Sequence, residues 1–276
     1  MTKLTHPQLE VALTGLLLFP LGSLPLLGSE HLWSGWKQAT CMPDACFCEA
    51  IRGGWIGQPI NVLSSLTFVV VALVVLAAGR HQSQSTQHLR LPLLIKPGLL
   101  WTYAAALALV GFGSAFYHAS LTFVGQVTDV LGMYLIAIFA VLYGLFRRGV
   151  ITRFPFVVCF VGANIVLLAL QVGAPVLRRY VFATLILAVL GVEYYVRRRG
   201  CSQFRTRYIA LAIISLAGGF ALWVLDITRT LCWPTSVFQG HALWHVSGAL
   251  ASYCLYKYYA SETDKPALLV PEEPLR

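Results

Sequence analysis

Residues 125–146 of this chain read GQVTDVLGMYLIAIFAVLYGLF and contain a single charged side chain, that of Asp129. A helix of about 20 apolar residues crosses a bilayer core, so this stretch predicts a membrane-spanning helix. Seven further stretches of comparable length and apolarity lie at 11–28, 60–79, 98–119, 154–172, 178–196, 208–226 and 239–258. With 58% hydrophobic and 11% charged residues among 276, the chain cannot cover a water-facing surface with charge. The expected fold is all-α, a polytopic transmembrane helix bundle.

The first of these stretches, 11–28, has two interpretations. It is interrupted by Pro20 and Pro25 and follows Lys3, so it is either a retained helix or the apolar part of a signal peptide. No small-x-small cleavage pattern follows, which favours a retained helix. The expected organisation is an amino-terminal helix and outer loop at 1–45, one membrane domain at 46–260 and a cytoplasmic tail at 261–276.

The basic residues are distributed unevenly between the two sides of the predicted bundle. Loops on the side of both termini hold 15 Lys and Arg residues, and loops on the other side hold 5. Because Lys and Arg stay preferentially in the cytoplasm, both termini are predicted to be cytoplasmic. The net charge of +9 reflects this asymmetry. A nucleic-acid partner is disfavoured, because the basic residues lie in separate loops rather than in one patch with interleaved aromatics.

Three of the seven histidines lie inside predicted membrane helices. His118 is at the outer end of the third, while His241 and His245 are one turn apart at the outer start of the last. The i, i+4 spacing places the latter two on one helix face. A single intramembrane histidine is often a packing residue, but three at one depth predict a metal site. Zinc favours imidazole ligands, and three of them leave the open position that a catalytic site needs.

The general base must come from outside the histidine pair. Metalloproteases place a glutamate next to the first histidine, whereas here Ala242 follows His241. Asp129 begins the fourth predicted helix, one short turn after His118. A carboxylate at a helix centre in a membrane costs about 2.5–3.5 kcal/mol, so it calls for a role. We expect Asp129 to act as general base and acid on the water at the metal; orienting a histidine is the alternative.

Two other acidic residues lie in or beside the predicted spans. Glu193 is expected to pair with Arg197, four residues further along the same helix. Asp226 ends the seventh predicted helix. It either forms a structural pair with Arg229 or orients a metal ligand, and the structural role is favoured.

Ser114 lies one turn before His118 on the same helix face. Serine in membrane helices commonly joins helices, especially beside small residues such as Gly111 and Gly113, which allow close approach. A hydroxyl at this place could also donate to an oxyanion. The spacing leaves both roles open.

Four of the seven cysteines fall on the predicted outer side. They are Cys41, Cys46, Cys48 and Cys232. An oxidising compartment would permit disulfides among them, but spacing alone does not give the connectivity. Free thiols remain the alternative.

The motifs together resemble the alkaline ceramidase family, part of the CREST superfamily of membrane hydrolases. The resemblance extends from about Cys46 to Tyr258. The residues that carry it are Gly111-x-Gly113-Ser114-x-x-x-His118, Asp129 eleven positions later, Asp226 before a cysteine-containing loop, and His241-x-x-x-His245. The resemblance implies a seven-helix core with one extra amino-terminal helix, zinc held by the three histidines, and an attacking water contacted by Ser114 and Asp129.

The segment before the second predicted helix differs from that of animal members of the family. The chain has Cys48-Glu49 and then Gln58-Pro59-Ile60-Asn61 where animal members carry a longer acidic, calcium-binding segment. Only Glu49 matches a calcium ligand, so the resemblance does not extend to a complete calcium site. In this respect the chain is similar to bacterial members, which implies a bacterial inner membrane. The distribution of Lys and Arg predicts that the active site lies toward the outer face. The family also implies a disulfide between Cys48 and Cys232.

The function implied by the resemblance is zinc-dependent hydrolysis of the N-acyl amide of ceramides to a fatty acid and a sphingoid base. The partner is then a ceramide-like lipid within the bilayer, with neither nucleic acid nor an obligate protein partner. Three alternatives stay open: a seven-helix receptor or sensor with a zinc site, a hydrolase of another lipid amide or ester, and a metal transporter. Against transport, the candidate ligands stay at one depth, whereas an ion path needs polar groups across the membrane.

Overall fold

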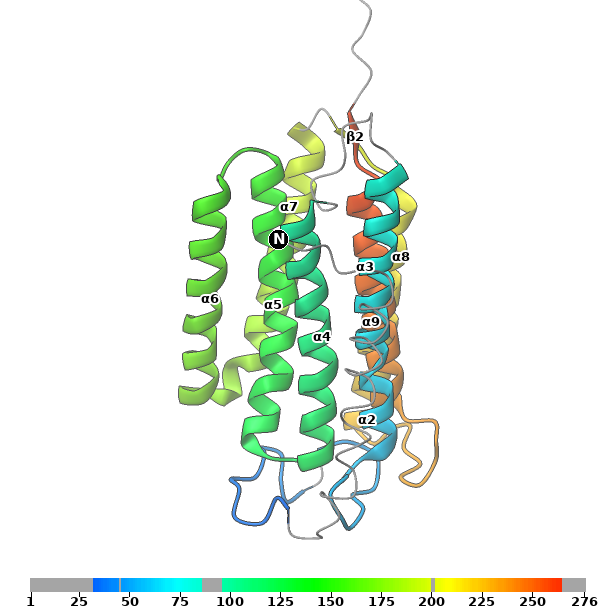
Figure 1. Cartoon of the computed structure of the whole chain (residues 1–276). Helices are drawn as coiled ribbons and strands as arrows, with labels where there is room; N and C mark the ends of the chain where they lie inside the picture. Colours follow the sequence, from blue (N-terminus) through cyan, green and yellow to red (C-terminus); the bar gives the residue numbers. More distant parts are fainter. Residues whose placement is uncertain (1–31, 45, 86–95, 200–201, 265–276) are drawn as a thin grey trace, which may run out of the picture.

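The computed structural model describes residues 32–44, 46–85, 96–199 and 202–264, which form a bundle of long helices (Figure 1). The helices are α2 Pro59–Ser65, α3 Thr67–Ser85, α4 Pro97–Ser120, α5 Phe123–Arg147, α6 Arg153–Gly173, α7 Arg178–Arg199, α8 Thr206–Ile227 and α9 Gly240–Ala260. Six spans in the described part of the chain are long and apolar enough to cross a membrane. The protein is therefore a multi-pass membrane protein, as predicted.

The seven predicted spans from residue 60 onward each correspond to a helix of the bundle. The first of them is made of two pieces, because α2 and α3 form one span, Pro59–Gln82, with a break at Leu66. The predicted helix at 11–28 lies outside the described residues.

The last span, α9, is not among the six that are apolar enough to cross a membrane by composition. It carries both His241 and His245, and most of its polar and aromatic side chains are buried. A helix surrounded by other helices need not present a fully apolar surface to lipid, which explains its composition.

The helices lie side by side and alternate in direction (Figure 1). Neighbours along the chain pack together in α4–α5, α5–α6 and α8–α9, while α3 packs against α4 and α9, and α7 packs against α5. One end of the bundle, which we call the site end, holds segment 46–58, the α4–α5 turn and the loop between α8 and α9. The opposite end holds the only strands in the described residues, the antiparallel pair β1 (Ser202–Gln203) and β2 (Thr263–Asp264).

Local sequence signals explain where several helices begin. Pro59 and Pro97 stand in the first turns of α2 and α4, where the missing amide hydrogen has no helical partner to lose. Thr122 caps α5 by accepting a hydrogen bond from the amide of Gly125. Because α5 begins directly after this cap, the connection from α4 is short and the end of α4 lies beside the start of α5.

The opposite end contains a buried ion pair that differs from the predicted one. Glu193 of α7 pairs with Arg147 of α5 and not with Arg197. The Arg147 guanidinium also lies over the rings of Tyr143 and Tyr259. The prediction was wrong because it considered only helical neighbours, whereas packing of α5 against α7 brings an arginine to Glu193.

Candidate active site

Three histidines form a buried cluster at the site end. His118 ends α4, and His241 and His245 occupy the first two turns of α9. Their candidate ligand atoms all lie within 4.8 Å of one another. The Nε2 atoms of His118 and His241 are 3.1 Å apart, close to the roughly 3.3 Å expected for two nitrogens each about 2.0 Å from one tetrahedral ion. The cluster could therefore hold a metal ion.

The ring of His118 is oriented by a glutamine. Its Nδ1 lies 2.9 Å from the side-chain oxygen of Gln58. An amide oxygen only accepts hydrogen bonds, so Nδ1 carries the proton and Nε2 keeps its lone pair free. The backbone amide of Gln58 also donates to the carbonyl of His118 at 3.0 Å, which ties the start of α2 to the end of α4.

The ring of His245 is oriented by serines of α2. Its Nδ1 lies 2.8 Å from the hydroxyl of Ser64 and 3.3 Å from that of Ser65. Ser64 uses its own proton in a 3.0 Å bond to the carbonyl of Asn61. The hydroxyl oxygen therefore accepts from Nδ1 of His245, and Nε2 again keeps its lone pair.

Ser114 is fully buried at the centre of this arrangement. Its hydroxyl lies 3.3 Å from Nε2 of His245 and accepts a 3.0 Å hydrogen bond from Ser65. Gly111, one turn earlier on α4, lets the helix approach α3 closely: a Cβ at Gly111 would stand 2.6 Å from a methyl of Val69. The predicted close approach of helices at this glycine is present.

Asp129 of α5 faces the Ser114 hydroxyl, and both side chains line the same cavity. The contact between α4 and α5 depends on Gly113, where a Cβ would stand 2.8 Å from the carbonyl oxygen of Thr128. The structure thus brings together all five predicted site residues, His118, His241, His245, Ser114 and Asp129.

Two disulfides hold the segment that lies against the histidines, residues 41–44 and 46–48, which we call the covering segment. The Cys48–Cys232 disulfide, which the family resemblance implies, is present, and a second one joins Cys41 to Cys46. Phe47 lies between the two, with its ring stacked on that of His241 at 3.8 Å. The covering segment is therefore cross-linked both within itself and to the loop before α9.

Asp226 is a structural anchor for this cover. It is fully buried, and its two oxygens accept hydrogen bonds from the backbone amides of Cys48 (2.9 Å) and His241 (3.0 Å). It therefore fixes the start of α9 relative to the covering segment. These two hydrogen bonds to backbone amides support the predicted structural role of Asp226 at the edge of the cluster.

Glu49, the one match to a calcium ligand, has both carboxylate oxygens engaged. They accept hydrogen bonds from the amides of Ile60 (2.8 Å) and Asn61 (2.9 Å) at the start of α2. Burial raises the pKa of the Glu49 carboxyl, while these two amides and nearby Arg52 act in the opposite direction. Negative charge at a helix amino terminus is stabilising, so Glu49 holds α2 in place below the histidines.

A cavity of about 150 Å³ extends from the cluster into the bundle. At one end it is lined by Ser114, Asp129, His241 and His245, and most of its other lining residues are apolar. Along α9 the lining runs to Leu255, fourteen residues from His241, which is about 21 Å of helix. These four side chains thus stand at one end of a long chamber whose remaining lining is mostly apolar.

Comparison with known proteins identifies the family. The family model for ceramidases matches residues 47–265. This chain belongs to the ceramidase family. Family membership implies hydrolase activity, in agreement with the resemblance found in the motifs.

Two proteins of Dictyostelium discoideum are similar to this ceramidase-family chain. "Putative alkaline ceramidase dcd3B" is 25% identical over 249 residues, covering 78% of this chain and 84% of the relative. "Putative alkaline ceramidase dcd3A" is 25% identical over 244 residues, covering 78% and 83%. The similarity to bacterial members is not borne out, and the assignment to a bacterial inner membrane loses its support with it.

The motifs of this ceramidase-family chain do not include the residues that orient the histidine rings. Gln58, Asn61 and Ser65 recur at helical spacing, with Ser64 beside them, at the start of a mostly apolar span, a pattern that places the first three on one face. That polar stripe is a signal for α2 facing the cluster. Phe47 has no such signal, because its stacking depends on how the loops fold.

Proposed function

We propose that this protein is a zinc-dependent intramembrane amidohydrolase that cleaves ceramide-like lipids to a fatty acid and a sphingoid base. The observation that carries the proposal is the position of the buried histidines, with Ser114 and Asp129, at the polar end of the apolar cavity. A ceramide has the matching shape, with one amide beside two long apolar chains. The match to the ceramidase family and the two relatives support this substrate class.

The donor set fits zinc. His118 and His245 have Nδ1 engaged by an amide oxygen and a hydroxyl, with Nε2 free toward the cluster, which is the usual way of orienting histidine ligands. Three neutral imidazoles with an open fourth position are a common catalytic zinc set. Zinc bound there would supply a Lewis acid that lowers the pKa of water to about 7 and polarises a carbonyl.

The remaining steps fall to two side chains. Asp129 takes the proton from water as the water oxygen attacks the amide carbonyl carbon. Ser114 lies beside His245, so its hydroxyl donates to the oxygen on which negative charge develops. As the carbon–nitrogen bond breaks, Asp129 returns the proton to the departing amine, a necessary step because an amide nitrogen is a poor leaving group.

The walls of the cavity fit a substrate that arrives from the lipid phase. The chamber is bounded on one side by α7, through Phe182 and Ile186, and on another by α8, through Ile213 and Leu216. Because α7 packs on α5 and α8 packs on α9, the chamber lies between two separate helix pairs. We propose that the lipid chains enter between α7 and α8.

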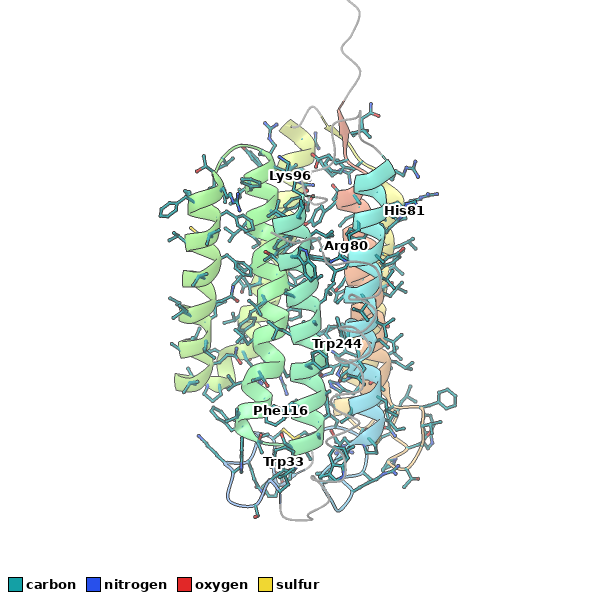
Figure 2. The ribbon with its side chains drawn as sticks, viewed as in Figure 1. Trp33, Arg80, His81, Lys96, Phe116 and Trp244 are labelled. Atoms are coloured by element: carbon teal, nitrogen blue, oxygen red, sulfur yellow. A yellow bond between two sulfur atoms is a disulfide. The ribbon has the colours of Figure 1, made fainter. Side chains whose placement is uncertain are left out.

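The proposed orientation places the site toward the outer face. Figure 2 shows Arg80 and Lys96 at the end opposite Trp33 and Phe116, which mark the site end. Most Lys and Arg residues in the loops belong with Arg80 and Lys96, and basic loops stay in the cytoplasm. The disulfides at the site end agree with an oxidising outer compartment.

The proposal is tested with purified protein and ceramides labelled separately on the acyl chain and on the base. We expect release of both labelled products in equal amounts by the wild type, and none by His245→Ala. His81→Ala is the matched control, because His81 is an exposed histidine at the opposite end (Figure 2). Absence of turnover for every acyl length, or full turnover by His245→Ala, would refute the proposal; the former would favour a receptor or sensor.

A further inference from the structure

The three histidines of the cluster are not held in the same way. Nδ1 of His118 is bonded to Gln58, and Nδ1 of His245 to Ser64. Nδ1 of His241 is buried and has no hydrogen-bond partner among the described residues. A ligand histidine almost always donates its second nitrogen to an acceptor that fixes the ring, so His241 requires another means of orientation.

The ring of Phe47 lies against the imidazole of His241 and could orient it. Phe47 stacks on His241 with ring centroids 3.8 Å apart and an interplanar angle of 25°. It also contacts the ring of His118 at 5.0 Å, with the rings tilted. A ring lying flat against an imidazole resists rotation about the Cβ–Cγ bond, which is the rotation that would turn Nε2 of His241 away from His118.

Phe47 is itself held on both sides. The residue before it, Cys46, is joined to Cys41, and the residue after it, Cys48, is joined to Cys232. The Phe47 ring packs with the buried cluster around Tyr117, whose ring it meets nearly edge-on at 6.1 Å. A phenylalanine between two half-cystines keeps its ring in register with the helices beneath it.

The backbones of the two stacked residues share one anchor. Asp226 accepts the amide of Cys48 through one oxygen and the amide of His241 through the other. The start of α9 and the segment carrying Phe47 are therefore positioned by the same buried carboxylate. This arrangement maintains the stacking distance even though the two residues lie far apart in the sequence.

We propose that Phe47 is a positioning residue for His241, orienting its imidazole toward the metal by stacking where the other two histidines use hydrogen bonds. The inference rests on the proposed function in assuming that the cluster binds zinc. It concerns the affinity for zinc and not the identity of the lipid.

Three substitutions separate orientation from simple filling of space. Phe47→Ala removes both the ring and its volume. Phe47→Leu retains most of the volume but has no flat face, and Phe47→Trp retains a flat face. Loss of a partner that orients a metal ligand typically weakens metal binding by about 10- to 100-fold. We expect a weakening of about 10-fold in the Ala and Leu variants and an affinity near that of the wild type for Trp.

The measurement is the zinc dissociation constant of detergent-purified, metal-stripped protein, determined by competition with a chromophoric chelator. Phe116→Ala is the matched control, because Phe116 is also a partly buried phenylalanine at the site end but packs against Trp33 and Trp36. The melting temperature of each metal-free variant shows whether the fold is retained. If Phe47→Ala does not fold, the comparison of Leu with Trp decides.

The outcomes distinguish this inference from the proposed function. Weaker zinc binding in the Ala and Leu variants, restored in Trp, supports the positioning role. Unchanged zinc affinity in Phe47→Leu, with normal ceramide hydrolysis, overturns it and leaves the proposed function standing. A wild-type protein that binds zinc but cleaves no ceramide refutes the proposed function, while the comparison of Phe47 variants keeps its meaning.

Discussion

Replacing Gln58 by Leu tests whether the hydrogen bond to His118 supports metal binding. The amide oxygen of Gln58 lies 2.9 Å from Nδ1 of His118, and both side chains are completely buried. Leucine cannot accept, and water has no access, so the Nδ1–H group would lose its only acceptor. A buried donor left without a partner costs about 1–3 kcal/mol. At 1.4 kcal/mol per factor of ten, zinc should bind about 5- to 150-fold more weakly.

The assay for Gln58→Leu is chelator competition for zinc, with two companion variants. Gln58→Glu retains an acceptor and adds negative charge, so we expect zinc affinity at least equal to that of the wild type. Gln171→Leu makes the same change at another buried glutamine, on α6 at the edge of the bundle, and should leave zinc affinity unchanged. Wild-type zinc affinity in Gln58→Leu, or equal weakening in Gln171→Leu, would refute the reasoning.

Three further changes have expected outcomes. Ala251→Phe fills the inner half of the cavity and should shift ceramide hydrolysis toward shorter acyl chains, measured with a chain-length series, whereas Leu250→Phe on the exposed face of α9 should not. Reduction of the Cys48–Cys232 disulfide, which spans 184 residues, should lower the melting temperature and weaken zinc binding. If reduction changed neither the melting temperature nor the zinc affinity, the anchoring role would be contradicted. Glu193→Gln breaks a buried ion pair, which typically costs about 3–5 kcal/mol, and should lower the melting temperature while zinc affinity, set at the other end, stays constant.

The positions of the spans could be predicted from sequence because they depend on one local property. A run of about 20 apolar residues must cross the bilayer, and each predicted span from residue 60 onward has its helix. The break at Leu66 was not predicted, because the stretch as a whole is apolar enough to be taken as one continuous span. The amino-terminal stretch at 11–28 stays a prediction.

The candidate site was partly predictable for a related reason. Spacing on single helices placed His241 beside His245 and Ser114 beside His118, and the alternation of helix direction brought both pairs to one end. The ring partners could not be found in this way, because Gln58 reaches His118 through packing of α2 against α4. The prediction for Glu193 was wrong for the same reason, because its partner Arg147 lies on a different helix.

The disulfides show the limit of spacing most clearly. Cys41 and Cys46 are five residues apart, and nothing local chooses between this pairing and others. The Cys48–Cys232 pairing came only from the family resemblance. Both depend on where loops meet at the site end, which follows from the whole bundle.

The most direct test of the central claim is metal removal and replacement during ceramide hydrolysis. Protein treated with a strong chelator and freed of it should release no labelled fatty acid, and stoichiometric zinc should restore release. His241→Ala should show no recovery at the same zinc concentration, since one of three ligands is gone. Undiminished hydrolysis by protein shown to contain no zinc would contradict the account.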